Sequence, residues 1–273
     1  MKPYSNKITL TRNGRGVYCI DTTMGCASGM AANKGGCYND CYAARTAKRY
    51  GHNFNQTVLR CFESERHKRE ILQQITKIKM PFIRIGASGD PSENWDHTVS
   101  ILKTLSKCNT EIIIITRHWT LLTKEQLEYL SRLNICINTS VSALDNEEML
   151  IRSIDQYQRI KLYCKSVLRI VSCNFNEENK TGNHMAEVQR QLFKNDSTLD
   201  TVFRPSKNNR FVVDGIIKAK EEVFNGKKQL ASKFNRKTYM GKCSACKEMC
   251  GVNIGTNNVY MNKPGIVQQG RLL

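Results

Sequence analysis

Closely spaced cysteines are the residues of this sequence best suited to chemistry. Cys26, Cys37 and Cys41 share one stretch, in which Gly35 and Gly36 let the backbone fold tightly around a bound centre. Thiolates are the ligands of zinc and of iron–sulfur clusters. Structural zinc usually takes four ligands in two close pairs, whereas three close thiols leave a cluster one position for an outside ligand. Structural zinc, or cysteines that only pack, are the alternatives.

A second group, Cys243, Cys246 and Cys250, has the spacing C-x2-C-x3-C. Thiols this close in sequence reach one ion or cluster with little loss of chain entropy. The group therefore predicts a second metal site, which holds either zinc or another iron–sulfur cluster. No fourth ligand is evident nearby in the sequence.

The compartment decides how the twelve cysteines are interpreted. The N-terminal residues lack the apolar centre of a signal peptide, and no apolar run is long enough to span a bilayer. We therefore expect a cytoplasmic protein without a membrane partner, in which disulfides are rare. The remaining cysteines are expected to be small buried side chains, with Cys19 and Cys61 as reserve ligands of the first group.

The charge balance is strongly basic. The 273 residues include 42 Lys and Arg against 24 Asp and Glu, a formal charge of +18. Such an excess attracts polyanions, which favours a nucleic acid or a nucleotide-like substrate as the partner. The alternative is a lysine-rich protein whose cations are spread along the chain and are simply solvated.

Six apolar runs rich in Ile and Val are predicted to be buried strands. They span 16–21, 81–87, 111–116, 134–142, 166–172 and 201–205. Amphipathic helices are predicted between them at 63–79, 95–107, 123–133 and 145–160. Thr123 and Asp145 have the positions of N-caps.

This alternation predicts an α/β fold, a partial (β/α)6 TIM-like barrel of parallel strands. A doubly wound sheet is the alternative. We expect residues 1–213 to form the barrel, and the basic residues 214–273 to form a C-terminal extension that carries the second cysteine group.

The sequence resembles the radical S-adenosylmethionine (SAM) superfamily over roughly residues 16–206. The resemblance rests on the cysteine loop after the first strand and on "ASGDP" (87–91) after the second. Ser88, Gly89, Asp90 and Pro91 stand where that superfamily commonly has a Gly-Gly-Glu-Pro-like turn that meets the amino group of the cofactor. The usual loop is C-x3-C-x2-C, whereas this one is C-x10-C-x3-C.

The pattern C-x3-C-Y-A-x-R, with "SGD", "TR-x-W" and late cysteines, is also similar to a phage-associated family of poorly defined function. The resemblance implies a [4Fe–4S] cluster on Cys26, Cys37 and Cys41. Its fourth iron would chelate SAM, and an external electron donor would drive cleavage to a 5′-deoxyadenosyl radical.

Further cofactor residues are predicted on physical grounds. Asp90, at a strand end, suits a cationic amine. Asn138, Ser140 and Ser142 alternate along the fourth strand, so one face offers hydrogen bonds to a ribose. Arg169 lies in an apolar strand and needs an anionic partner, for which a cofactor carboxylate would serve. Ordinary structural pairing is the alternative in each case.

Two other functions remain open at this stage. One is a non-catalytic, zinc-stabilised nucleic-acid binder in which both cysteine groups are structural. The other is a metal-dependent nucleic-acid-processing enzyme without a radical, whose carboxylates would be Asp90, Glu93 and Asp96.

Overall fold

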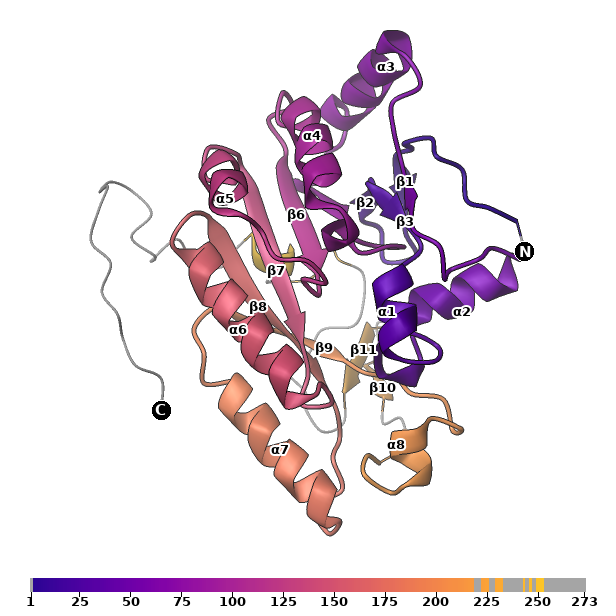
Figure 1. Cartoon of the computed structure of the whole chain (residues 1–273), viewed down its shortest axis with the longest axis vertical. Coiled ribbons are helices and arrows are strands. Elements are labelled where there is room, and N and C mark those ends of the chain that lie inside the picture. Colours follow the sequence, from indigo (N-terminus) through magenta and orange to yellow (C-terminus); the bar gives the residue numbers. More distant parts are fainter. Residues whose placement is uncertain are drawn as a thin grey trace.

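A seven-stranded sheet forms the centre of the molecule in a computed structural model of the chain (Figure 1). The structure describes residues 2–218, the backbone of 222–225 and 229–232, and residues 243, 246 and 249–252. The strands, in sheet order, are β1 (Thr11–Arg12), β2 (Tyr18–Cys19), β5 (Phe82–Ile85), β6 (Glu111–Thr116), β7 (Ile135–Val141), β8 (Lys165–Ser172) and β9 (Thr198–Val202). The strands β2 to β9 are parallel, and β1 pairs antiparallel to β2 at one edge.

The sheet confirms the α/β class. β2, β5, β6, β7, β8 and β9 correspond to the six predicted strands and follow one another in chain order. A doubly wound sheet would reverse its strand order midway, and this one does not. Within the described residues the sheet is open, so closure into a TIM-like barrel is not shown.

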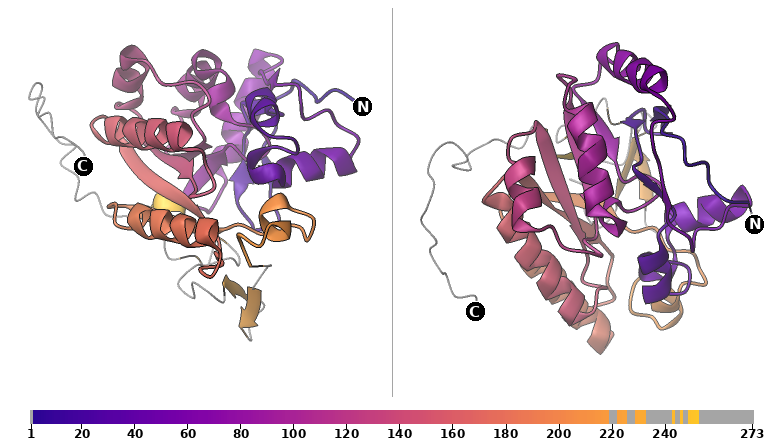
Figure 2. Two further views of the ribbon diagram at one scale, coloured as in Figure 1. Left: turned by 60° about the horizontal axis from the view of Figure 1, so that its bottom comes forward. Right: turned by 45° about the horizontal axis from the view of Figure 1, so that its top comes forward.

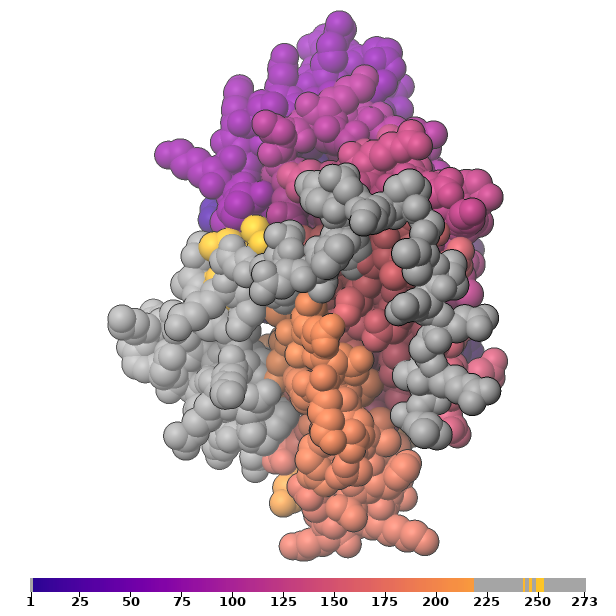
Figure 3. Space-filling view, turned by 90° about the vertical axis from the view of Figure 1, so that its left-hand side faces the viewer, coloured from indigo at the N-terminus to yellow at the C-terminus, as the bar shows by residue number. Residues whose placement is uncertain are grey.

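Helices cover one face of the sheet (Figures 1 and 2). They are α3 (Glu65–Thr76), α4 (Trp95–Leu105), α5 (Lys124–Leu130), α6 (Glu147–Lys161) and α7 (Lys180–Leu192). The first four were predicted. α7 was not, because few of its residues are buried, namely Gly182, Ala186 and Leu192. In Figures 1 and 3, α3 and α7 lie at opposite ends of the molecule.

The two predicted caps have different outcomes. Thr123 accepts a hydrogen bond from the N–H of Gln126 and completes a capping box at the start of α5, as predicted. The cap of α6 was wrong by one residue. Asn146 caps this helix and accepts from the N–H of Met149, because the carboxylate of Asp145 is paired with Arg117 instead.

The face of the sheet opposite the helices carries a smaller core. Phe82, Ile113 and Val167 pack there against Cys243. The short turn η4 (Met249–Gly251), yellow in Figure 2, lies against this face. Gly251 has φ +101, and an added Cβ would lie 2.7 Å from Val167 Cγ2, so only glycine fits this close approach.

The rest of the predicted C-terminal extension is only partly described. The expected boundary at 213/214 coincides with the end of α8 (Arg210–Val213), and β10 (Glu222–Asn225) pairs antiparallel with β11 (Gln229–Ser232). The division into two units itself stays a prediction. In the described part of the chain, no helix has the length and apolar composition needed to cross a membrane.

An insertion between β2 and α3 carries the first cysteine group. Its elements are β3 (Thr23–Met24), α1 (Ala27–Ala32), η1 (Cys37–Asn39), α2 (Tyr42–Arg49) and β4 (Val58–Leu59). β3 and β4 pair antiparallel and hold the two ends of the insertion together. Figure 1 shows α1 and α2 beside the sheet, on the side of its shortest strands.

Candidate functional site

The three cysteines of the first group line one cavity of about 230 Å³. The turn after β5 forms another part of its wall through Gly86, Ala87, Gly89 and Asp90, and residues after β6 complete it through Arg117 and Trp119. The cavity therefore lies at the carboxyl ends of the parallel strands, where ligands commonly bind in α/β folds. The resemblance stated above implies that the cysteine loop and the 87–91 turn lie together, and in the structure both line this cavity.

Glycines give the cysteine loop its tight path. Gly35 and Gly36 have φ values of +83° and +79°, a region that side chains disfavour. An added Cβ at Gly36 would lie 2.6 Å from Cys41 Cβ, and one at Gly29 would lie 2.7 Å from Cys26 Sγ. The absence of side chains at these positions makes room for the cysteines beside the cavity.

Contacts with distant segments hold the loop in place. The carbonyl of Tyr38 accepts a hydrogen bond of 2.8 Å from Asn209 Nδ2. The carboxylate of Asp40 accepts from the N–H of Ser206 and pairs with Arg45 at 3.0 Å. Residues that follow β9 thus fix the loop at the cavity.

Arg117 joins the loop to β6 and β7. Its guanidinium donates to the Tyr38 hydroxyl and pairs with Asp145, and it lies over the rings of Tyr38 and Trp119. Arg117 is almost fully buried, so its charge is used mainly inside the protein. The sequence placed this residue at the strand end but did not anticipate its partner.

The surroundings of Cys26 and Cys37 disfavour the ionised form of their thiols. Burial raises the pKa of Cys26, and the carboxylates of Asp90 and Glu93 raise it further. Cys26 Sγ donates to Glu93 Oε1 at 3.3 Å. Burial also raises the pKa of Cys37 to about 12, although the positive charge of Arg117 opposes this. A metal would compensate, because it replaces the thiol proton with a greater positive charge.

The side chain of Asp21 holds the 86–90 turn in place. Its carboxylate accepts hydrogen bonds from the N–H groups of three consecutive residues, Gly86, Ala87 and Ser88, at 3.0, 2.7 and 3.1 Å. Gly89 sits against the 23–25 segment, where an added Cβ would lie 2.5 Å from the carbonyl oxygen of Thr23. Sequence reasoning missed Asp21, whose only signal was a carboxylate directly after the first strand.

Asp90 is buried, and both its carboxylate oxygens are already used. They accept from Ser92 N and Oγ, from Thr116 Oγ1 and from Arg117 N, at 2.7 to 2.9 Å. The side chain therefore ties the turn to β6. Its predicted role as the partner of a cofactor amine gains no support from this geometry. Gly89 and Asp90 form part of the wall of the cavity.

The other predicted cofactor residues do not line the cysteine cavity. Asn138 donates to the carbonyl of Cys250 at 3.0 Å, and Ser142 Oγ donates to the carbonyl of Val171 at 2.7 Å. Ser140 meets Arg117 through its own carbonyl oxygen. Arg169 lies beside the Cys250 sulfur. Their assignment to a cofactor stays a prediction, and structural pairings account for their contacts.

The second cysteine group lies on the face of the sheet opposite the helices. Cys243 is buried and donates its N–H to the carbonyl of Arg15, and the N–H of Cys246 donates to the carbonyl of Cys243. Cys250 packs in the same core. The two groups are thus on different surfaces of the sheet.

Within the described residues, no three His, Cys, Asp or Glu side chains are grouped as a single metal ion would need. A lone zinc ion requires its sulfurs to meet at about 2.3 Å from one point. A cluster binds each thiolate to a different iron, so its ligands stand farther apart around a larger object. Cys26, Cys37 and Cys41 line one cavity without forming a single-ion group.

The carboxylates Asp90, Glu93 and Asp96 do not form the hard-cation site considered above. Asp96 accepts from Gln126 Nε2 at 2.8 Å, and Glu93 accepts from Ser28 N and Thr57 Oγ1. Each carboxylate thus has its own protein partners, and the three do not share a site.

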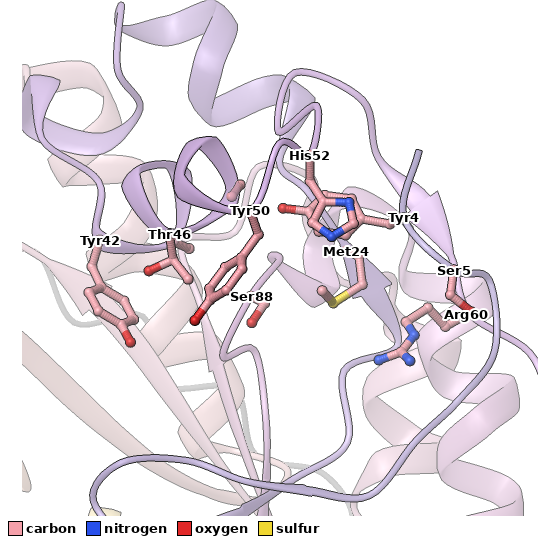
Figure 4. A pocket seen from close by; sticks show the side chains of 11 residues that line it. Tyr4, Ser5, Met24, Tyr42, Thr46, Tyr50, His52, Arg60 and Ser88 are labelled. Atoms are coloured by element: carbon pink, nitrogen blue, oxygen red, sulfur yellow. The ribbon is translucent and has the colours of Figure 1, made fainter. Parts of the chain in front are cut away.

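A second cavity of about 360 Å³ adjoins the first (Figure 4). Both are lined by Tyr42 and Ala43, and Ser88 lines the second beside Gly89 of the first. Tyr42, Thr46 and Tyr50 reach it from α2. Their spacing of four residues along a helix was the signal that sequence reasoning missed.

Aromatic and basic groups line this second cavity. Tyr4 and His52 stack with ring centroids 4.5 Å apart, and Figure 4 shows Met24 next to them. Tyr42 and Tyr50 are 69% and 68% exposed, unusually high for such large rings. Arg60 is buried, and neither its Nε nor His52 Nδ1 has a hydrogen-bond partner in the described structure.

Comparison with known proteins gives little further information. No model of a known family matches the chain, and no curated protein matches it. One solved structure with a similar fold is the crystal structure of Streptococcus suis SuiB bound to S-adenosylmethionine. The TM-score is 0.42 with 16% identity, and the match covers 60% of this chain but only 38% of that one. This likeness is too low to support an argument about the site.

Proposed function

We propose that this chain is a SAM-dependent radical enzyme that holds a [4Fe–4S] cluster on Cys26, Cys37 and Cys41. The observation that carries the proposal is the meeting of these three thiols with the 86–90 turn around one cavity at the carboxyl ends of the strands. When bound, such a cluster supplies the electron that cleaves the sulfonium of SAM. Three protein thiolates leave one iron for that ligand.

The protein's own residues position and enclose the reacting groups. Tyr38 and Asp40 fix the cysteine loop to the segments after β6 and β9, while Asp21 orders the opposite wall. Trp119 lines the cavity next to Cys26 and excludes water from that side. A preformed and largely buried site costs little reorganisation when a ligand binds.

We propose a nucleotide or nucleic acid as the substrate, bound in the second cavity. The Tyr4–His52 stack and the exposed rings of Tyr42 and Tyr50 offer flat surfaces on which a base can stack. Arg60 also lines this cavity, and its guanidinium charge suits a phosphate. The shared wall with the first cavity would keep the base close to the cofactor.

Anaerobic reconstitution with iron and sulfide tests the cluster. We expect iron binding, visible absorption and a spin-resonance signal on reduction. SAM and dithionite should then yield 5′-deoxyadenosine. Cys37→Ala should abolish that product. Cys61→Ala should leave it unchanged, because this exposed cysteine, a reserve ligand by sequence, does not line the cavity.

A reconstituted chain that makes no 5′-deoxyadenosine, or makes it equally well with Cys37→Ala, would contradict the proposal. A chain that purifies with bound zinc and takes up no iron would instead favour the non-catalytic nucleic-acid binder.

A further inference from the structure

Two arginines point into the core on the face of the sheet opposite the helices. Their neighbours Ile83 and Ile85 on β5, and Leu168 and Ile170 on β8, pack on the helix-covered side. Because side chains alternate along a strand, Arg84 and Arg169 face the other way. The two lie on strands with β6 and β7 between them.

No carboxylate in the described structure forms an ion pair with either arginine, although both are largely buried. Arg84 Nε has no hydrogen-bond partner there. Asp21 lies near Arg84, but its oxygens already serve the 86–88 turn. Burial lowers the pKa of Arg169, the Cys250 sulfur opposes this, and the like charge of Arg84 lowers it further. Buried cations of this kind need an anion.

The groups that face these arginines are cysteines. Arg84 is the neighbour of Cys19 across β2 and β5, and Cys19 packs in one core cluster with Cys243 and Cys250. The sulfur of Cys250 interacts electrostatically with Arg169. Burial raises the pKa of Cys243, and the positive charges of Arg15, Arg84 and Arg169 oppose this. A neutral thiol is a weak partner for a guanidinium, whereas a metal-bound thiolate is a strong one.

We propose that Cys19 is the fourth ligand of a metal centre whose other ligands are Cys243, Cys246 and Cys250, and that Arg84 and Arg169 neutralise it. Four thiolates around one Zn²⁺, or around a [4Fe–4S]²⁺ cluster, make a dianion. Arg84 and Arg169 supply two positive charges beside it, and Arg15 adds a third. Because no single-ion geometry is formed by the described thiols, metal binding must draw them together through rotation of their side chains.

Cys136 is the rival for the fourth position, since an added Cβ on Gly251 would lie 3.1 Å from its sulfur. The charges nearest Cys136 are Lys165 and Glu111, which pair with each other at 3.2 Å. Because Lys165 and Glu111 neutralise each other, that pair needs no further anion. Cys19 instead faces an unpaired guanidinium, which is why we assign it the ligand role.

The test removes the first site and counts metal at the second. The parent is the full chain with Cys26→Ala, Cys37→Ala and Cys41→Ala, reconstituted anaerobically and analysed for iron, sulfide and zinc. We expect the parent to retain metal, and Cys19→Ser in that parent to lose it. Cys136→Ser and Cys108→Ser, the latter a buried cysteine on the helix side, should retain it.

Full metal retention after Cys19→Ser, loss after Cys136→Ser instead, or a folded parent without metal would overturn the assignment. Should the parent not fold, the unaltered chain offers the same comparison. There, Cys19→Ser should remove part of the bound metal and Cys108→Ser none. Because the count needs no turnover, its result is separate from that of the 5′-deoxyadenosine assay.

A separate experiment tests the role of Arg84 and Arg169. Replacing Arg84 and Arg169 together by Met should speed the loss of metal to a chelator, because the dianion loses its counter-charges. Lys at both positions keeps the charge and should restore retention. Equal rates in the Met and Lys variants would show that the guanidinium groups do not neutralise a centre.

Discussion

Asp90 illustrates how a residue acquires its role. By type and position it suits a cofactor amine, yet four protein hydrogen bonds use its carboxylate. We expect Asp90→Asn to destabilise the fold by about 1–3 kcal/mol, because the amide nitrogen leaves at least one buried donor unpaired. Urea unfolding measures this. A variant as stable as the parent would mean that the carboxylate is not what ties the turn to β6.

His118 makes a prediction about pH. It is fully buried, and burial, aided by the charges of Arg152 and Arg117, lowers its pKa from 6.5 to about 3. The unfolded chain takes up a proton below about pH 6.5 while the folded chain stays neutral, so stability falls as the pH drops from 6.5 towards 3. The loss is on the order of 1 kcal/mol per pH unit.

His118→Asn should remove this component of the pH dependence. Asparagine tolerates the left-handed backbone at this position, where φ is +54. Unfolding free energies at pH 7 and pH 5 provide the comparison, and carboxylates contribute to both proteins alike. Parallel losses in the two proteins would show that His118 titrates normally.

At the scale of elements, the cysteine loop depends on backbone shape as much as on its ligands. Gly36→Ala should weaken iron binding, because its Cβ would meet Cys41 Cβ at 2.6 Å. Gly51→Ala is the matched control, since Gly51 has a similar φ of +75 but open space around it. Gly51→Ala should cost about 1–2 kcal/mol of stability from its positive φ. Gly36→Ala should cost more, because its φ of +79 and ψ of −159 lie in a region that only glycine commonly adopts.

Only Gly36→Ala should reduce the iron retained after reconstitution. Equal iron in the two variants would mean that the shape of the loop at Gly36 does not set the positions of the thiols.

At the scale of the whole molecule, the formal charge of +18 predicts salt-dependent binding of nucleic acid. Lys48 and Arg49 are exposed in the last turn of α2, next to the second cavity. Reversing both to Glu should weaken binding of a single-stranded oligonucleotide at least tenfold at low salt, with a shallower salt slope.

Lys124→Glu with Arg132→Glu changes the net charge equally on exposed residues of the α5 region, away from that cavity. This control should bind nearly as well as the parent in fluorescence anisotropy. Equal losses of affinity in the two double variants would show that net charge, and not the surface beside α2, drives binding.

The sequence by itself determined six strands of the sheet and the helices α3 to α6, because runs of Ile and Val and amphipathic spacing are local properties. The resemblance linked Cys26, Cys37 and Cys41 to the 87–91 turn, and the two segments line one cavity, because the carboxyl ends of parallel strands lie at one edge of a sheet. The cap at Asp145 failed because a distant arginine competes for the same carboxylate.

Tertiary structure alone decided which groups meet across the chain. Cys19 and Cys243 pack in one core cluster although more than two hundred residues separate them, a neighbourhood that no sequence window shows. The same holds for the donors that use Asp90 and for the aromatic cavity, which is lined by residues near the N-terminus, β3, α2 and the 86–90 turn. The physical reason is burial, which removes water as a partner and forces each polar group to find one within the fold, wherever in the sequence it lies.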